Sequence, residues 1–113
     1  MIPHRLVRSE DFTRAYREGK SRSHRLLALH YARNPHGYAR VGYVAGRGVG
    51  GAVARNRAKR LLREATRGLA ERLTPGYDLV LVARRPLSQA HMQDAREAIR
   101  DVLGRAGLLR DRE

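Results

Sequence analysis

Residues 52–73, AVARNRAKRLLREATRGLAERL, contain the pattern that decides how this chain folds. Small and apolar side chains recur there at spacings of three and four: Ala54, Ala58, Leu61, Leu62, Ala65, Leu69 and Leu73. Such spacing places them on one side of an α-helix. The sequence therefore predicts a long helix over residues 52–73 that packs this side against a core and ends before Thr74-Pro75-Gly76.

The other side of this helix is cationic. At about 100° per residue, its outward rows consist of Arg55, Lys59, Arg63 and Arg67, with Asn56 and Arg60 beside them. Guanidinium groups offer paired donors that match phosphate oxygens. A merely solvated face would alternate in sign to form ion pairs, but Glu64 and Glu71 are the only acids in the helix. We interpret these rows as a nucleic-acid-binding surface.

The charge of the whole chain supports this interpretation. The sequence has 24 Lys and Arg against 11 Asp and Glu, a net charge of +13, and residues 1–72 hold 17 of the basic residues against 5 acids. A compositional preference for arginine would explain Arg in place of Lys, but not the excess of positive charge. A domain this basic is expected to bind a polyanion.

The remaining elements predict an α+β fold. We expect a first helix capped by Ser9 and ending near Gly19, strands over 24–33 and 38–45 joined as a hairpin by the turn at 34–37, a buried strand over 77–83, and a last helix capped by Ser88. The predicted order is α-β-β-α-β-α, with room for one more short strand, in a two-layer α-β sandwich with a small mixed sheet and three helices. Residues 1–113 are expected to form a single domain, with 107–113 as a frayed tail.

A glycine-rich loop precedes the long helix. Gly46-x-Gly48-x-x-Gly51 follows a predicted strand and matches the dinucleotide-binding fingerprint literally. The next strand, however, ends in Ala83-Arg84-Arg85 and not in the acid that binds ribose, although an Arg could suit a 2′-phosphate. A loop whose amides and Arg47 approach a nucleic-acid phosphate, or a plain structural turn, is the favoured interpretation.

No catalytic or metal-binding pattern is present in the sequence. Cysteine is absent, the five His are scattered without metal-ligand spacing, and no pair of acids suggests acid–base chemistry. We expect no catalytic residue, no metal site and no cofactor bound by the protein alone. Met1–Arg8 has no apolar stretch typical of a signal peptide, and we expect a cytoplasmic protein without a membrane partner.

The chain closely resembles the bacterial ribonuclease P protein family. The family's signature is present at residues 55–64, as Arg-Asn-Arg-x-Lys-Arg-x-x-Arg-Glu. His4-Arg5-Leu6, Arg40-Val41-Gly42 and Tyr77-Asp78 agree with the family in flanking positions, and the resemblance covers roughly residues 4–108. This resemblance implies the family's fold, an α-β sandwich with a left-handed crossover.

The resemblance also implies partners and site residues. Members bind a large catalytic RNA, which cuts precursor tRNA using divalent metal ions such as Mg²⁺, and hold the single-stranded 5′ leader in a cleft. The positions that match the family's RNA contacts are Arg55, Asn56, Arg57, Lys59, Arg60 and Arg63, to which the charge pattern adds Arg67 and Arg47. Phe12, Tyr16 and His30 would line the leader cleft, with ordinary core as the alternative for Phe12 and Tyr16. His30 stands where the family often has an aromatic residue.

We therefore expect an accessory subunit of ribonuclease P that assists removal of the 5′ leader by binding the catalytic RNA and precursor tRNA. Sulfate or phosphate is expected to bind the free protein. Two alternatives remain open from the sequence: an RNA-binding protein of ribosomal type with no part in cleavage, and an NADP-binding fragment.

Overall fold

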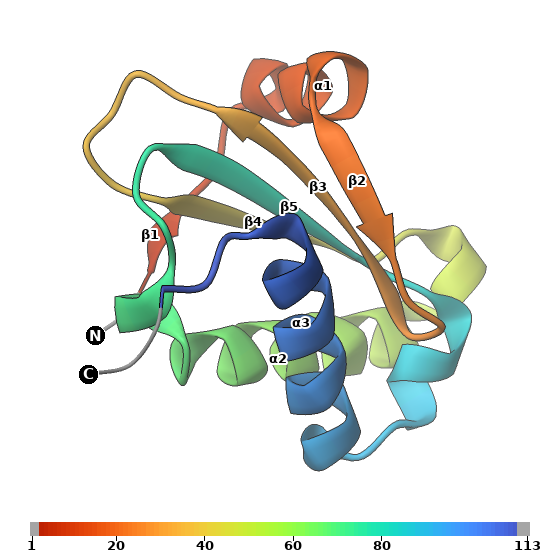
Figure 1. Cartoon of the computed structure of the whole chain (residues 1–113). Coiled ribbons are helices and arrows are strands. Elements are labelled where there is room, and N and C mark those ends of the chain that lie inside the picture. Colours follow the sequence, from red (N-terminus) through yellow and green to blue (C-terminus); the bar gives the residue numbers. More distant parts are fainter. Residues whose placement is uncertain (1–2, 111–113) are drawn as a thin grey trace.

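The computed structural model describes residues 3–110, and within them it contains a five-stranded sheet and three α-helices (Figure 1). The helices are α1 (Ser9–Glu18), α2 (Ala52–Arg67) and α3 (Met92–Ala106). The strands are β1 (His4–Arg5), β2 (Lys20–Ser23), β3 (Leu27–Arg33), β4 (Arg40–Val44) and β5 (Tyr77–Ala83). Three short 3₁₀ turns are η1 (Arg47–Val49), η2 (Ala70–Arg72) and η3 (Arg85–Gln89). The predicted α+β class with three helices and a mixed sheet is confirmed.

The predicted hairpin between strands 24–33 and 38–45, which correspond to β3 and β4, is wrong. The strand order is β1-β4-β5-β3-β2, so β5 lies between β3 and β4, antiparallel to the first and parallel to the second. The chain passes through α2 between the parallel strands β4 and β5. β5 is buried along most of its length, on both faces, and only a central position in the sheet covers a strand of this kind.

The sheet has two short strands beyond the three that were assigned to residue ranges, whereas the prediction left room for one. β2, Lys-Ser-Arg-Ser, pairs antiparallel with β3 at one edge of the sheet, and the two residues of β1 pair parallel with β4 at the other. Neither strand has alternating apolar residues, so the sequence pattern could not predict them. A strand at the edge of a sheet can remain polar. β3 begins at Leu27 and not at residue 24, since His24–Leu26 forms the turn that follows β2.

Helix boundaries also differ from the predictions. α2 ends at Arg67, and Leu69 and Leu73 reach the core from the η2 segment. Ser9 is the first helical residue of α1 and Arg8 the N-cap. Ser88 lies within η3, where its Oγ donates to the Arg85 carbonyl, and α3 begins after His91, whose amide donates to Asp94 Oδ2 at 3.2 Å.

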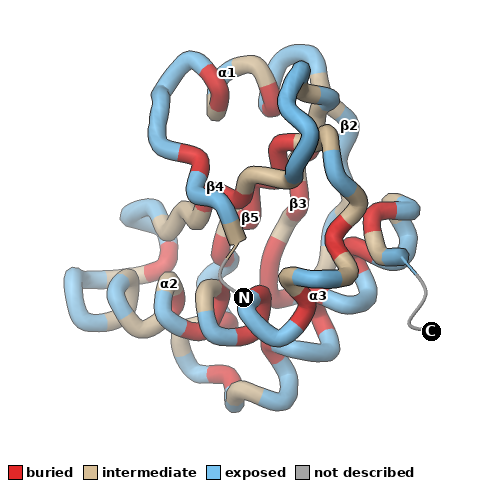
Figure 2. The backbone as a smooth tube through the Cα atoms, turned by 90° about the vertical axis from the view of Figure 1, so that its left-hand side faces the viewer, coloured by how far each residue is buried: buried red, intermediate tan, exposed pale blue. Residues whose placement is uncertain are grey.

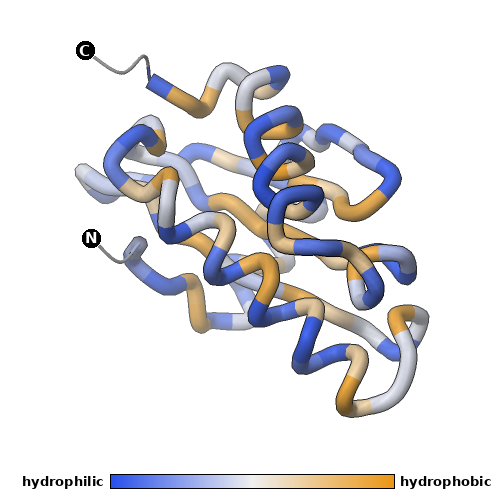
Figure 3. Tube along the Cα trace, turned by 90° about the horizontal axis from the view of Figure 1, so that it is seen from below, coloured by the Kyte–Doolittle hydropathy of each residue, from blue (hydrophilic) through white to orange (hydrophobic). Residues whose placement is uncertain are grey.

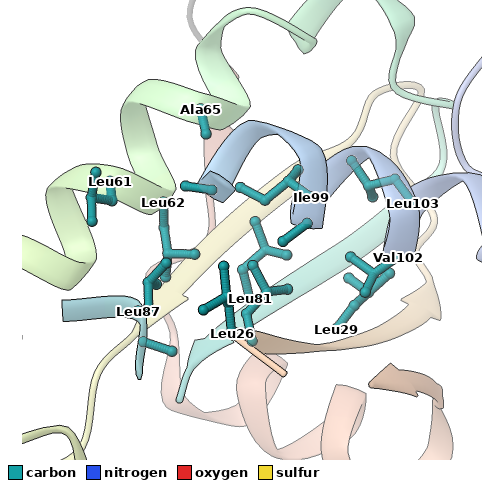
Figure 4. Close-up of a cluster of buried hydrophobic side chains, with 14 of the residues drawn as sticks. Leu26, Leu29, Leu61, Leu62, Ala65, Leu81, Leu87, Ile99, Val102 and Leu103 are labelled. Atoms are coloured by element: carbon teal, nitrogen blue, oxygen red, sulfur yellow. The ribbon is translucent and has the colours of Figure 1, made fainter. Parts of the chain in front are cut away.

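The sheet has helices on both faces. α2 and α3 cover one face, where Leu62, Leu81 and Ile99 meet in the main core (Figure 4). α1 covers part of the other face, where Ala15 packs on Leu6 and Val80 (Figure 1). Buried residues lie along the inner strands β3 and β5 and on the sides of α2 and α3 that face the sheet (Figure 2).

Residues 107–110, which follow α3, pack against the rest of the protein. Leu108 is 2% exposed, Leu109 bridges to Leu73, and the Arg110 amide donates to the Arg72 carbonyl at 2.7 Å. The predicted frayed tail is therefore wrong for 107–110, because Leu108 buries its side chain in the main core. Residues 111–113 lie outside the described part of the chain.

Candidate RNA-binding surfaces

α2 has the two-sided character that its sequence predicts. Its inward side chains, Ala58, Leu61, Leu62, Ala65 and Thr66, are buried. Asn56, Arg60 and Arg67 are exposed and Arg55, Lys59 and Arg63 half-buried. In Figure 3 the long helix that crosses the view alternates between hydrophobic and hydrophilic positions. We call these six outward residues the basic helix surface.

The cations of this surface have few acidic partners. Arg67 Nη1 lies 3.8 Å from Glu64 Oε2, and in residues 3–110 no other member lies within ion-pair distance of a carboxylate. Arg55 Nη1 donates to the Gly50 carbonyl at 3.2 Å, which leaves its other donors available. The surface can therefore present several guanidinium groups to phosphates at once.

Arg57 lies apart from the other cations of the helix. Its Nη2 donates to the Ala90 carbonyl at 2.8 Å, and its side chain is partly buried against the segment before α3. The structure thus gives Arg57 a fixed role in holding α2 against this segment.

The glycine loop is a folded turn. The amides of Val49 and Gly50 donate to the carbonyls of Gly46 and Arg47, and Val49 is buried. Gly50 has φ +141°, a conformation that favours glycine. Because these two amides are used inside the loop, the loop offers little of the phosphate cradle of a dinucleotide site, while Arg47 remains exposed.

The face of the sheet under α1 carries the three residues predicted for a leader cleft. The rings of Tyr16 on α1 and His30 on β3 have centroids 4.9 Å apart and meet edge to face at 81°. Tyr16 is 44% exposed, and burial raises the pKa of Tyr16 and lowers that of His30. Phe12 packs on Leu6 and Val80 and lies so close to Gly42 that a Cβ there would be 2.5 Å from its ring. Tyr16 is therefore the exposed ring of the three, Phe12 and His30 are half-buried, and Phe12 also holds α1 against the sheet.

A cavity of about 580 Å³ extends this face toward the glycine loop. Val44 and Val82 form its apolar floor, and Arg25, Arg84 and Arg85 lie around it with Gly46 and Gly48. The sequence drew attention to Arg84 and Arg85 only in connection with a dinucleotide site, and to Arg25 only as part of the overall charge. An apolar floor with cations at its margin can receive bases and phosphates of a single strand.

A buried ion network fixes α1 over the sheet. Asp78 on β5 is fully buried, and it accepts hydrogen bonds at 2.8 Å from Arg14, Asn34 and Arg40. Arg14 and Arg40 also lie 3.0 Å and 3.5 Å from Asp11. Burial raises the pKa of Asp78, but the hydrogen bonds from Arg40, Asn34 and Arg14 outweigh it and hold the pKa below its usual value.

A second, smaller cavity of about 100 Å³ lies where α2 meets the β1 edge of the sheet. Arg63 and Arg67 of α2 and Arg5 of β1 line it, with Pro3 and Tyr43. Burial raises the pKa of Tyr43, while the three arginines act in the opposite direction. The pairing of β1 with β4 brings Arg5 here, which no periodicity in the sequence predicted.

Within residues 3–110 no group of three or more His, Cys, Asp or Glu side chains could hold a metal ion. Over the same residues, no helix has the length and apolar character needed to cross a membrane.

Comparison with known proteins gives one consistent family. Residues 2–107 match the family described as Ribonuclease P. A ribonuclease P protein component from Pelotomaculum thermopropionicum is 39% identical over 105 residues, covering 93% of this chain and 94% of the relative, and one from Clostridioides difficile is 35% identical over 104 residues, covering 91% of each.

Solved structures agree with the sequence relatives. The RNase P protein of Thermotoga maritima is 31% identical and superimposes with a TM-score of 0.80 over 90% of this chain and 96% of that one. The Staphylococcus aureus RNase P protein is 25% identical, with a TM-score of 0.85 over 94% and 97% of the two chains. This chain therefore belongs to the family of ribonuclease P protein components.

Proposed function

We propose that this chain is the protein subunit of ribonuclease P and that it assists removal of the 5′ leader from precursor tRNA. The observation that carries the proposal is the separation of two surfaces on opposite faces of one sheet. The basic helix surface lies on the α2 side, and the Tyr16–His30 pair lies on the other side, where α1 meets β3. One protein can thereby contact two RNAs at once.

The basic helix surface is proposed to bind the catalytic RNA. Its guanidinium groups are largely free of carboxylates, and Asn56 can donate to or accept from a neighbouring sugar or phosphate. Contacts of this kind give affinity that does not depend on base sequence. Arg47, exposed in the turn before α2, would add a further phosphate contact.

The face under α1 is proposed to bind the single-stranded leader. Exposed rings can stack on any base, which suits a leader of variable sequence. The apolar floor at Val44 and Val82 and the arginines around it would continue this path toward the glycine loop. Phe12 would act here mainly by supporting α1.

The chemical step is proposed to belong to the catalytic RNA and its divalent metal ions, such as Mg²⁺. The protein would act by holding RNA, with no catalytic residue of its own. Sulfate or phosphate is proposed to occupy the Arg5–Arg63–Arg67 pocket of the free protein, because three guanidinium groups meet there.

Reconstitution tests the proposal. The protein and the catalytic RNA, at a magnesium concentration too low for the RNA alone, should cleave precursor tRNA faster than the RNA without protein. No enhancement at protein concentrations that saturate the RNA would overturn the proposal in favour of an RNA-binding role outside cleavage.

A further inference from the structure

Two arginines are held over two tyrosines at the end of β3. Arg22 Cζ lies 5.9 Å from the centre of the Tyr31 ring, and Arg33 Cζ lies 5.5 Å from that of Tyr77. The centres of the two tyrosine rings are 6.3 Å apart. Attraction between a guanidinium and a ring face at such distances orders the side chain. Arg22 Nη1 also donates to the Ser21 carbonyl at 2.7 Å, which leaves the remaining N–H groups of Arg22 for a ligand.

The strand register brings a third cation to the same place. Lys20 pairs with Tyr31, and Arg33 pairs with Tyr77. Because directly paired residues point to the same face of a sheet, Lys20, Arg33 and both tyrosines lie on one face, and Arg22 joins them two residues after Lys20. We call these five residues the Tyr–Arg surface.

The Tyr–Arg surface has an excess of positive charge. In residues 3–110, Lys20, Arg22 and Arg33 have no carboxylate within ion-pair distance, whereas the exposed Arg105 pairs with Asp101 at 2.9 Å. Lys20 and Arg33 are exposed and Arg22 is half-buried. Ordered, unpaired cations can bind the phosphates of a single strand. Tyr31 is only 7% exposed, so it supports Arg22 and does not stack on a base.

A cavity joins this surface to α1. It measures about 430 Å³ and is lined from α1 by Arg14 and Glu18 and from β2, β3 and β5 by Lys20, Tyr31, Arg33 and Tyr77. Between them the chain turns tightly at Gly19, where a Cβ would collide with the Tyr31 carbonyl oxygen. This turn keeps the end of α1 directly against β3.

The same turn places the cavity beside the Tyr16–His30 pair. Tyr16 lies two residues before Glu18, and His30 precedes Tyr31 and pairs with Ser21 of β2. β2 is the edge of the sheet, and its start follows directly from α1 (Figure 1). A strand that leaves the α1 face at His30 therefore meets the Tyr–Arg surface as soon as it crosses the β2 edge.

We propose that the Tyr–Arg surface is a second site for single-stranded RNA and receives the leader nucleotides that lie upstream of those at Tyr16 and His30. The arginines bind the leader's phosphates and the tyrosines hold the arginines in place. This inference rests on the proposed function, since it requires the leader to run across the α1 face.

Leader length provides the test. The holoenzyme, reconstituted from the catalytic RNA and either wild-type protein or the Arg22→Gln/Arg33→Gln variant, is titrated with precursor tRNAs whose leaders grow by one nucleotide at a time. The variant should bind short leaders like wild type and lose about tenfold in affinity once the leader passes a threshold length. For long leaders its salt slope should be flatter by about 1.4, the value for two contacts on a single strand.

The matched control is Arg96→Gln/Arg100→Gln, which removes the same charge from exposed positions of α3. It should bind leaders of every length like wild type. Thermal melting of all the proteins tests whether folding is unchanged. If the double variant is unstable, Arg33→Gln alone, at an exposed site, repeats the test.

Two results would overturn the inference. The first is wild-type affinity of the variant for every leader length. The second is an equal loss for short and long leaders, or weaker assembly with the catalytic RNA in the absence of substrate, either of which would assign the surface to the catalytic RNA. Failure of the proposed function is distinct: the wild-type holoenzyme would then not favour precursor over mature tRNA even with a short leader.

Discussion

The ring of Tyr16 on α1 meets the ring of His30 on β3 edge to face, with centroids 4.9 Å apart, on the face of the sheet opposite α2 and α3. The contact joins a helix to the sheet, yet Tyr16 remains 44% exposed. A ring in this position is held in orientation by its partner and still presents surface to a ligand.

Replacing Tyr16 by Ala should weaken the binding of precursor tRNA and leave the binding of mature tRNA nearly unchanged. Only the precursor has a leader, and loss of one stacked base is worth about 1–3 kcal/mol, so about a tenfold loss in affinity is expected. Tyr38→Ala is the control, because Tyr38 is 40% exposed and lies on the loop before β4. Unchanged discrimination between the two RNAs by a stably folded Tyr16→Ala protein would remove Tyr16 from the leader site.

Replacing Arg60 by Ala should weaken assembly with the catalytic RNA. The side chain is exposed on α2, so the change should leave the melting temperature nearly unaltered. Affinity measured against salt concentration should show a slope flatter by about one unit, and precursor tRNAs with different leader sequences should be affected alike. Arg100→Ala on α3 serves as the control, and a change in base preference at constant slope would contradict the phosphate role.

Replacing Asp78 by Asn should destabilise the fold. The variant leaves Arg14 and Arg40 without their buried carboxylate, and breaking a buried pair of this type costs about 3–5 kcal/mol. Urea unfolding at neutral pH measures the difference. A loss below about 1 kcal/mol would show that the network contributes little to stability.

The pH dependence follows from the lowered pKa of Asp78 in the folded protein. A carboxyl group with a lowered folded-state pKa stabilises the protein above its unfolded pKa of about 3.9, and this contribution is lost as the pH falls through the folded value. The difference in unfolding free energy between wild type and Asp78→Asn should therefore be constant near neutral pH and shrink below about pH 4. If the difference in unfolding free energy did not shrink at lower pH, the lowered pKa assigned to Asp78 in the folded protein would be contradicted.

Replacing Gly42 by Ala should also destabilise the fold, by about 1–3 kcal/mol. The new Cβ would lie 2.5 Å from the Phe12 ring, so α1 would have to move away from the sheet. Combining the change with Phe12→Leu should recover part of the loss, because the smaller side chain makes room. Strictly additive losses in a double-mutant cycle would show that the two positions are independent.

Sulfate should raise the melting temperature more than chloride at matched ionic strength, because a ligand that binds only the folded state stabilises it. The net charge of +13 makes such a contribution large relative to that of a neutral protein. Arg5→Gln combined with Arg63→Gln should reduce the difference, since both residues line the pocket beside Tyr43. Arg96→Gln/Arg100→Gln is the control, and equal melting curves of wild type in the two salts would argue against anion binding.

The sequence by itself determined the features that depend on neighbours within one element. The period of the apolar residues in 52–73 requires a helix whose cations point outward, because side chains three and four apart share a face. Arg60 and Asn56 could be assigned to the candidate surface in this way. The same local reasoning placed Tyr16 on α1 and His30 on a strand.

Only the tertiary structure decided what depends on residues far apart in the chain. β5 enters between β3 and β4, so a turn at 34–37 that would suit a hairpin joins strands that do not pair. Asp78 binds Arg14, Asn34 and Arg40 from three other segments, and Arg57 turns toward Ala90 while its helical neighbours face solvent. The physical reason is that helix periodicity arises from backbone geometry within a few residues, whereas strand order and buried ion pairs depend on which distant segments best cover each other's apolar surface and satisfy each other's charges.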